Sequence, residues 1–81
     1  MWINGEKLFN SNSFDEIGII RVGKYHVLYG QRGKEKTSFF RYSDYESALV
    51  ELYEIERCMK AGKDYCELKP DGFYDDVRKR D

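Results

Sequence analysis

The most restrictive feature of this chain is a helical pattern of apolar residues that begins just after Ser43. Apolar side chains recur every three or four positions between residues 45 and 59, the spacing of one face of an α-helix. The face comprises Tyr45, Ala48, Leu49, Leu52, Ile55, the polar Glu56 and Met59. Ser43 and Glu46 match a capping box, and Gly62 is a typical stop signal. The pattern predicts one long amphipathic helix over residues 44–61.

Three segments before this helix have the composition of β-strands. Residues 17–22 are β-branched and apolar, residues 24–29 alternate so that Tyr25, Val27 and Tyr29 share one strand face, and residues 36–42 are rich in aromatic side chains. A glycine allows a tight turn after residue 22, and residues 30–35 are interpreted as a six-residue hairpin loop. The adjacent Phe39 and Phe40 should point to opposite faces, so that one of them is exposed or covered by the N-terminal hairpin.

The two ends of the chain add smaller elements. Asn4-Gly5 is a strong signal for a type I′ turn, which predicts an N-terminal hairpin over residues 1–9. Residues 65–69 alternate and are expected to form a short edge strand, followed by a turn at Pro70-Asp71-Gly72 and a charged tail over residues 75–81.

Length and pattern together define the expected architecture. Eighty-one residues suffice for one domain with a stability on the order of 5 kcal/mol. We predict a single α+β domain over residues 1–81, in which a small antiparallel sheet of three to four strands packs against the one long amphipathic helix. Its parts are the N-terminal hairpin 1–9, the central strands 17–42, the helix 44–61 and the C-terminal turn and tail 63–81.

Few residues suit catalysis or metal binding. The chain has one histidine, His26, and two cysteines, Cys58 and Cys66, which are too few for the usual Cys/His zinc site and do not form a disulfide scaffold. No paired acid and base is suggested, so we expect a non-enzymatic protein with no cofactor and no metal. The absence of a leader-like N-terminus and of an apolar run of roughly 20 residues predicts a cytoplasmic protein that is not bound to a membrane.

Charge is divided sharply along the chain. Residues 21–41 hold six basic side chains and one acidic one, whereas residues 44–56 hold five acidic side chains and no basic one. The overall charge of −1 gives no global attraction to nucleic acid, so any such binding must use a local patch. The candidate nucleic-acid-binding residues are Arg21, Lys24, His26, Arg32, Lys34, Lys36 and Arg41. The alternative is that these cations only line an exposed sheet and protect its edge from aggregation.

The stretch from Gly18 to Leu49 resembles two related kinds of DNA-binding domain. These are the DNA-binding domain of plant ethylene-response factors and the arm-site-binding N-terminal domain of phage-type tyrosine recombinases. The similarity is carried by Gly23-Lys24-Tyr25, Phe39-Phe40, Ser43 and Glu46-Ser47-Ala48. It implies a sheet that reads double-stranded DNA, with Arg21, Lys24, His26, Arg32, Lys36 and Arg41 as contacts. The chain differs from those domains in lacking the Trp and the dense Arg of their first two strands.

A protein-binding function is the alternative. A small, tyrosine-rich chain with an acidic helix resembles accessory proteins of phages and mobile elements that bind and modulate host proteins. We interpret Glu46, Val50, Glu51, Glu54 and Arg57 as an exposed stripe of the helix, next to Tyr53. Val50, Tyr53, Glu54 and Arg57 are the candidate contacts for a host protein or for a second copy in a homodimer, and a solvated helix face is the simpler interpretation.

Overall fold

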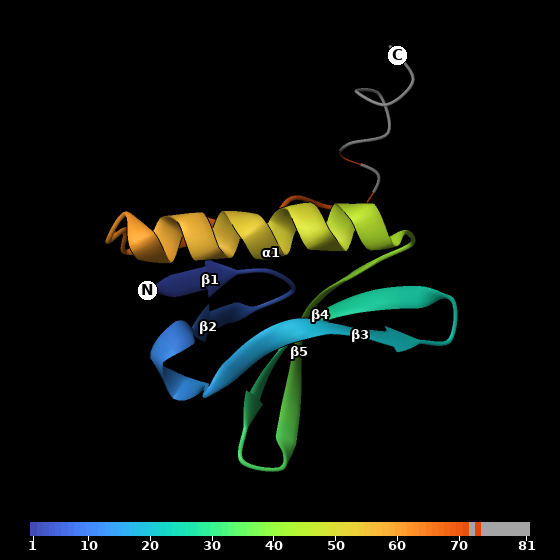
Figure 1. The fold of residues 1–81 in the computed structure, drawn as a ribbon, viewed down its shortest axis with the longest axis horizontal. Helices are drawn as coiled ribbons and strands as arrows, with labels where there is room; N and C mark the ends of the chain where they lie inside the picture. The colour runs from blue at the N-terminus through green and yellow to red at the C-terminus, as the bar shows by residue number, and fades with distance from the viewer. Residues whose placement is uncertain (72, 74–81) are drawn as a thin grey trace.

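The computed structural model describes residues 1–71 and 73, and within them six short strands, a 3₁₀ turn and one long helix follow each other (Figure 1). They are β1 (Trp2–Asn4), β2 (Leu8–Asn10), η1 (Ser11–Ser13), β3 (Glu16–Val22), β4 (Tyr25–Arg32), β5 (Glu35–Tyr42), α1 (Tyr45–Lys60) and β6 (Tyr65–Glu67). Gly72, the last residue of the predicted turn, and the predicted tail 75–81 lie outside the described residues.

The strands form two three-stranded sheets, which confirms the α+β class but replaces the one expected sheet. The larger sheet has the order β3-β4-β5 and is antiparallel throughout. The smaller sheet has the order β2-β1-β6, in which β1 pairs antiparallel with β2 and parallel with β6. The parallel pair is possible because a long crossover that includes α1 separates the two strands in sequence. The predicted N-terminal hairpin and edge strand are therefore neighbours.

Glycines with positive φ set the two turns of the larger sheet. Gly23 and Gly33 have φ values of 61° and 59°, and each is the first residue of a two-residue turn. This geometry matches the right-handed twist of the adjoining strands and favours glycine at that position. The six-residue loop predicted over residues 30–35 is therefore wrong, because β4 continues to Arg32 and only Gly33 and Lys34 form the turn.

The N-cap of α1 is Asp44, one residue later than the expected cap at Ser43. The carboxylate of Asp44 accepts hydrogen bonds from the backbone N–H and the hydroxyl of Ser47, at 3.3 and 3.2 Å. Ser43 instead donates its N–H and its hydroxyl to Asp71, both at 3.0 Å, which ties the helix start to the end of the described chain. The predicted Ser43 cap is thus wrong, because the Asp44 carboxylate accepts the hydrogen bonds of the first turn in its place.

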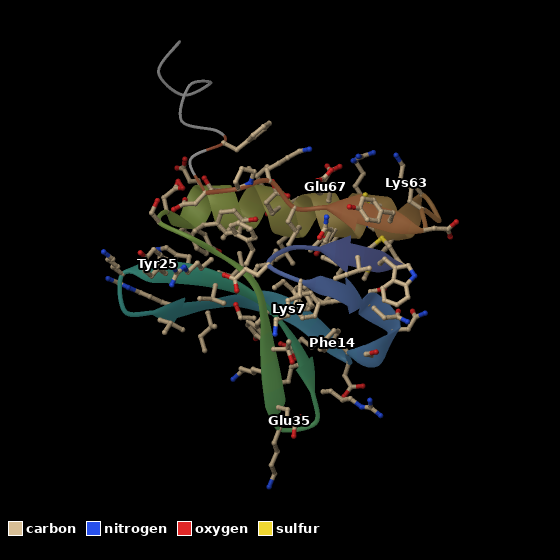
Figure 2. All side chains as sticks on the ribbon, turned by 180° about the vertical axis from the view of Figure 1, so that it is seen from behind. Lys7, Phe14, Tyr25, Glu35, Lys63 and Glu67 are labelled. Carbon is tan, nitrogen blue, oxygen red and sulfur yellow. The ribbon has the colours of Figure 1, made fainter. Side chains whose placement is uncertain are left out.

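The chain after α1 runs back along the helix and covers a second helix face (Figure 2). It begins with a turn in which the N–H of Lys63 donates to the carbonyl of Cys58 at 3.0 Å. It ends where the Tyr42 hydroxyl donates to the carbonyl of Lys69 at 3.0 Å. As a result Glu51 is fully buried, and its predicted place in an exposed stripe is wrong. The apolar periodicity of the helix identifies one buried face and gives no signal for a second face that a later segment covers.

The core lies between α1 and the two sheets. Its buried residues are Ile3, Leu28, Phe39, Tyr42, Ala48, Ile55, Cys58, Cys66 and Leu68. From the predicted helix face, Ala48 and Ile55 are buried, whereas Tyr45 and Met59 at the two ends are exposed. The buried positions of α1 run from Ser47 to Cys58, so the helix packs on the rest of the protein along most of its length.

A β-bulge at Phe39 joins the two sheets. The β4–β5 register shifts between Leu28 and Tyr29, which leaves Phe39 without a partner residue on β4. Its ring is fully buried, 4.8 Å from the Phe9 ring and 5.1 Å from the Phe14 ring between centroids. Its carbonyl accepts the N–H of Glu6 at 2.7 Å. Because of the bulge, Phe39 and Phe40 both contribute to the core, and the expectation that they point to opposite faces is wrong.

Gly5 occupies the point of closest approach between the sheets. A Cβ atom there would lie 2.2 Å from the carbonyl oxygen of Phe39, so no larger residue fits. The hairpin predicted from Asn4-Gly5 is confirmed, but the type I′ turn is wrong, because the positive φ of such a turn is not found at Gly5. The glycine is required by contact rather than by dihedral angle.

We predict that Phe39→Ala lowers the free energy of unfolding by about 3–5 kcal/mol, since it removes a buried ring with two aromatic neighbours. This is a large part of the stability of so small a domain. Urea denaturation followed by far-ultraviolet circular dichroism measures the change. Leu8→Ala is the control, because Leu8 is 57% exposed on β2 and its loss should change stability by about 0.5 kcal/mol or less. Similar losses for the two variants would contradict the role given to the bulge.

Candidate functional site

Strand alternation divides the larger sheet into two faces. The inner face carries Leu28 and its cross-strand neighbours Ile19 and Phe40, which pack toward α1. The residues in between form the outer face, which we define as Glu16, Gly18, Ile20, Val22, Tyr25, Val27, Tyr29, Gln31, Lys36, Ser38 and Arg41. The outer face is the surface of the sheet turned away from the helix.

The centre of the outer face is apolar and accessible to solvent. Ile20 and Val22 are 38% and 56% exposed, and Tyr25, Val27 and Tyr29 are half-buried. Soluble proteins usually expose such residues singly rather than as neighbours on adjoining strands. A cluster of this kind indicates a contact surface.

Cations lie against the two tyrosine rings of this face. The Lys24 Nζ and the Arg41 Cζ are 5.4 and 4.8 Å from the centroid of the Tyr25 ring. The Lys36 Nζ is 5.6 Å from the centroid of the Tyr29 ring. A cation–π contact at an exposed position contributes about 0.5–1 kcal/mol, so the contacts hold the cations near the rings without fixing them there.

Gly18 makes room for the Tyr29 ring. The two residues are cross-strand partners, and a Cβ atom on Gly18 would lie 3.1–3.4 Å from the hydroxyl, Cζ and Cε1 atoms of Tyr29. The ring therefore lies over the glycine, along the sheet, and its hydroxyl donates to Glu16 at 3.4 Å. Tyr29 is half-buried, with Lys36 over its ring.

An open hollow of about 320 Å³ lies beside Tyr25. It is lined by Glu6, Val22, Tyr25, Val27, Ser38 and Arg41. Glu6 comes from the turn between β1 and β2, which is held against β5 by the hydrogen bond to Phe39. The hollow thus has an apolar floor and polar groups at its edge, and its volume is near the lower limit for small-ligand pockets.

The seven predicted nucleic-acid-binding residues do not share one face. Lys36 and Arg41 belong to the outer face, and Lys24 lies in the adjoining turn. Arg21 and His26 are cross-strand partners at positions that belong to the inner face. The Arg21 side chain donates to the carbonyl of Gly23, and the His26 ring contacts the Tyr45 ring edge to face, 5.7 Å between centroids.

The remaining two cations, Arg32 and Lys34, are exposed at the β4–β5 turn, near Glu35. Figure 2 shows this turn at the end of the hairpin far from Tyr25. The outer face and its nearest turn therefore unite three of the seven predicted residues.

Sequence reasoning missed Glu6, Ser38 and Gly18 as parts of this surface. Glu6 and Ser38 are brought to the hollow by the contact between the two sheets, for which the sequence has no local signal. Gly18 did carry a signal, because a glycine within a β-branched strand often marks a close approach.

The alternative helix surface is also present. Val50 and Tyr53 are exposed on α1, and Tyr53 is 58% exposed. Arg57 forms an ion pair with Glu54, and this hydrogen bond lowers the pKa of the Glu54 carboxyl from its usual value. Exposed ion pairs of this kind contribute little to stability, so the four residues form a solvated face with two apolar members.

A second depression, of about 350 Å³, lies between α1 and β6. Both thiols, Cys58 and Cys66, line it, and both are free. Burial raises the pKa of the Cys66 thiol to about 12, and a hydrogen bond with Cys58 adds to the effect. Among residues 1–71 and 73, no group of three or more His, Cys, Asp or Glu side chains is placed to hold a metal ion.

Comparisons with protein-family models, with curated proteins and with solved structures each find no match to this chain. In the described part of the chain, no helix combines the length and the apolarity needed to cross a membrane.

We predict that the Cys66 thiol makes stability fall at alkaline pH. Because its pKa is higher in the folded protein than the usual value of about 8.5, the neutral thiol stabilises the fold. That contribution is complete below about pH 8.5 and is lost as the pH rises toward about 12.

Urea midpoints measured across this range for the wild type and for Cys66→Ala isolate the effect, because other titrating groups are common to both proteins. The wild type should lose more stability than the variant. Parallel pH profiles would show that the thiol is not protected by the fold.

Proposed function

We propose that this protein binds nucleic acid through the outer face of the β3-β4-β5 sheet. The observation that carries the proposal is the set of three cations, Lys24, Lys36 and Arg41, held against two tyrosine rings around an exposed apolar centre. Basic side chains neutralise phosphates, and aromatic rings contact bases.

The number of cations sets the expected strength of binding. Three neutralised phosphates correspond to a slope of about −2 to −3 in the logarithm of affinity against the logarithm of salt concentration. Such binding is modest and strongly dependent on salt. The helix α1, which carries most of the acidic side chains of residues 44–56, packs against the inner face of the sheet. Its charges are therefore on the other side of the sheet from the bound phosphates.

We predict that replacing Lys36 or Arg41 by Gln weakens nucleic-acid binding and reduces the steepness of its salt dependence by about 0.7–0.9 per residue. The measurement is the fluorescence anisotropy of labelled mixed-sequence oligonucleotides, both duplex and single-stranded, over a range of salt concentrations. Amide NMR titrations of the wild type should show shifts concentrated on β3, β4 and β5.

Lys63→Gln is the matched control, because it removes the same charge at the far end of α1 from Tyr25 (Figure 2). This variant should bind as the wild type does. An equal loss with Lys63→Gln would mean that only the total charge matters, and no NMR shifts with any oligonucleotide at low salt would refute the proposal.

The helix surface supports a second candidate, the binding of a host protein or of a second copy. Its basis is the exposure of Val50 and Tyr53 on the same face of α1. A homodimer through this face would appear as a concentration-dependent increase in mass by analytical ultracentrifugation, and Tyr53→Ala would abolish it. A monomer at all concentrations would exclude the second copy.

A further inference from the structure

We infer that the nucleic acid bound by the outer face is single-stranded, and that its bases stack on Tyr25 and Tyr29. This inference rests on the proposed function and specifies its ligand. It departs from the duplex that the sequence favoured. Four features of the outer face support it: the two separate ring positions, the apolar centre between them, the setting of each ring, and the position of the charges.

Tyr25 and Tyr29 offer two separate stacking positions. They are four residues apart on β4, on the same face, which places them at most about 13 Å apart along the strand. In a duplex each base is stacked on neighbours about 3.4 Å away, so its faces are closed to a side-chain ring. A base that stacks on either ring must therefore be unstacked from a neighbouring base, which a single strand allows.

The apolar centre points to the same ligand. Ile20, Val22 and Val27 offer no donor or acceptor to the polar edges that a duplex presents in its grooves. An unpaired base, in contrast, has an apolar π-face as well as a polar edge. The exposed centre between the two rings suits a third base, which would lie over Val27.

Each ring is prepared to receive a base. Tyr29 lies over Gly18 with the Lys36 Nζ over its ring, so a base that stacks on Tyr29 would displace Lys36 from the ring and leave its charge for a phosphate. Tyr25 forms one wall of the 320 Å³ hollow, whose floor is Val22 and Val27 and whose edge carries polar groups. A base in the hollow would contact the ring with its face and the polar groups with its edge.

Charge separates the place of the bases from the place of the phosphates. Glu6 lies at the hollow, and Glu16 accepts the Tyr29 hydroxyl, so both carboxylates would repel a phosphate at the centre of the face. Lys24 and Lys36 are exposed, and their Nζ atoms lie over the Tyr25 and Tyr29 rings, within reach of a phosphate beside a stacked base. Neutral bases at the centre avoid repulsion by the two carboxylates, while the phosphates bind Lys24, Lys36 and Arg41.

The test compares three fluorescein-labelled probes of one mixed sequence: single-stranded DNA, single-stranded RNA and the DNA duplex. Anisotropy titrations at low salt with the full chain should show that at least one single strand binds tenfold or more tightly than the duplex. The two single-stranded probes reveal which sugar is preferred.

Tyrosine variants test the stacking. Tyr25→Ala and Tyr29→Ala should each weaken single-strand binding about 5- to 140-fold and leave the salt slope unchanged, because a base contact is lost and the phosphate contacts are kept. Tyr25→Phe and Tyr29→Phe keep the ring and should bind nearly as the wild type does. Tyr65→Ala, which removes the same side chain from an exposed position on β6, is the matched control. Circular dichroism establishes that each variant is folded.

The outcomes separate the two proposals. Duplex binding that equals or exceeds single-strand binding would overturn this inference and leave the proposed function standing. Binding of no probe would overturn both. Single-strand binding that survives both Ala substitutions but is lost with Arg41→Gln would refute stacking, as would an equal loss with Tyr65→Ala.

Discussion

The bulge at Phe39 is the interaction on which the rest of the structure depends. One extra residue in β5 turns two consecutive aromatic side chains toward the core and frees a backbone carbonyl from the β4 ladder. That carbonyl is not left unsatisfied, because it accepts the N–H of Glu6 from the smaller sheet. The same contact positions Glu6 at the hollow of the outer face. Core packing, the junction of the sheets and the shape of the candidate site therefore share one origin.

Local signals in the sequence were sufficient for the elements of the fold. The periodicity from Tyr45 to Met59 and the glycine at position 62 located the helix, and the alternation around Tyr25, Val27 and Tyr29 located a strand and the residues that share one of its faces. These features depend on neighbours in sequence, which single-sequence patterns describe well. The α+β class followed from them.

Features that depend on distant neighbours were not accessible in this way. Glu51 has the charge of a solvated residue, yet it is buried next to the segment that returns along α1. The six cations of residues 21–41 are clustered in sequence. Side chains alternate between the two faces of a strand, and the hairpin register fixes which residues are neighbours, so the cations are distributed over both faces and two turns. The sequence identified the sheet as the candidate site, but pairing register decided which of its residues can act together.

The pairing of β1 with β6 has a consequence for how the chain reaches its fold. The side-chain amide of Asn4 on β1 donates to the Tyr65 hydroxyl on β6, across 61 positions of sequence. Contacts of such high sequence separation form late, because a long loop must close before they contribute. During synthesis β1 is made before β6 and has to wait for it to complete the smaller sheet, while the β3-β4-β5 meander can pair as soon as it is made. The candidate binding surface is thus built on the part of the protein that can fold first.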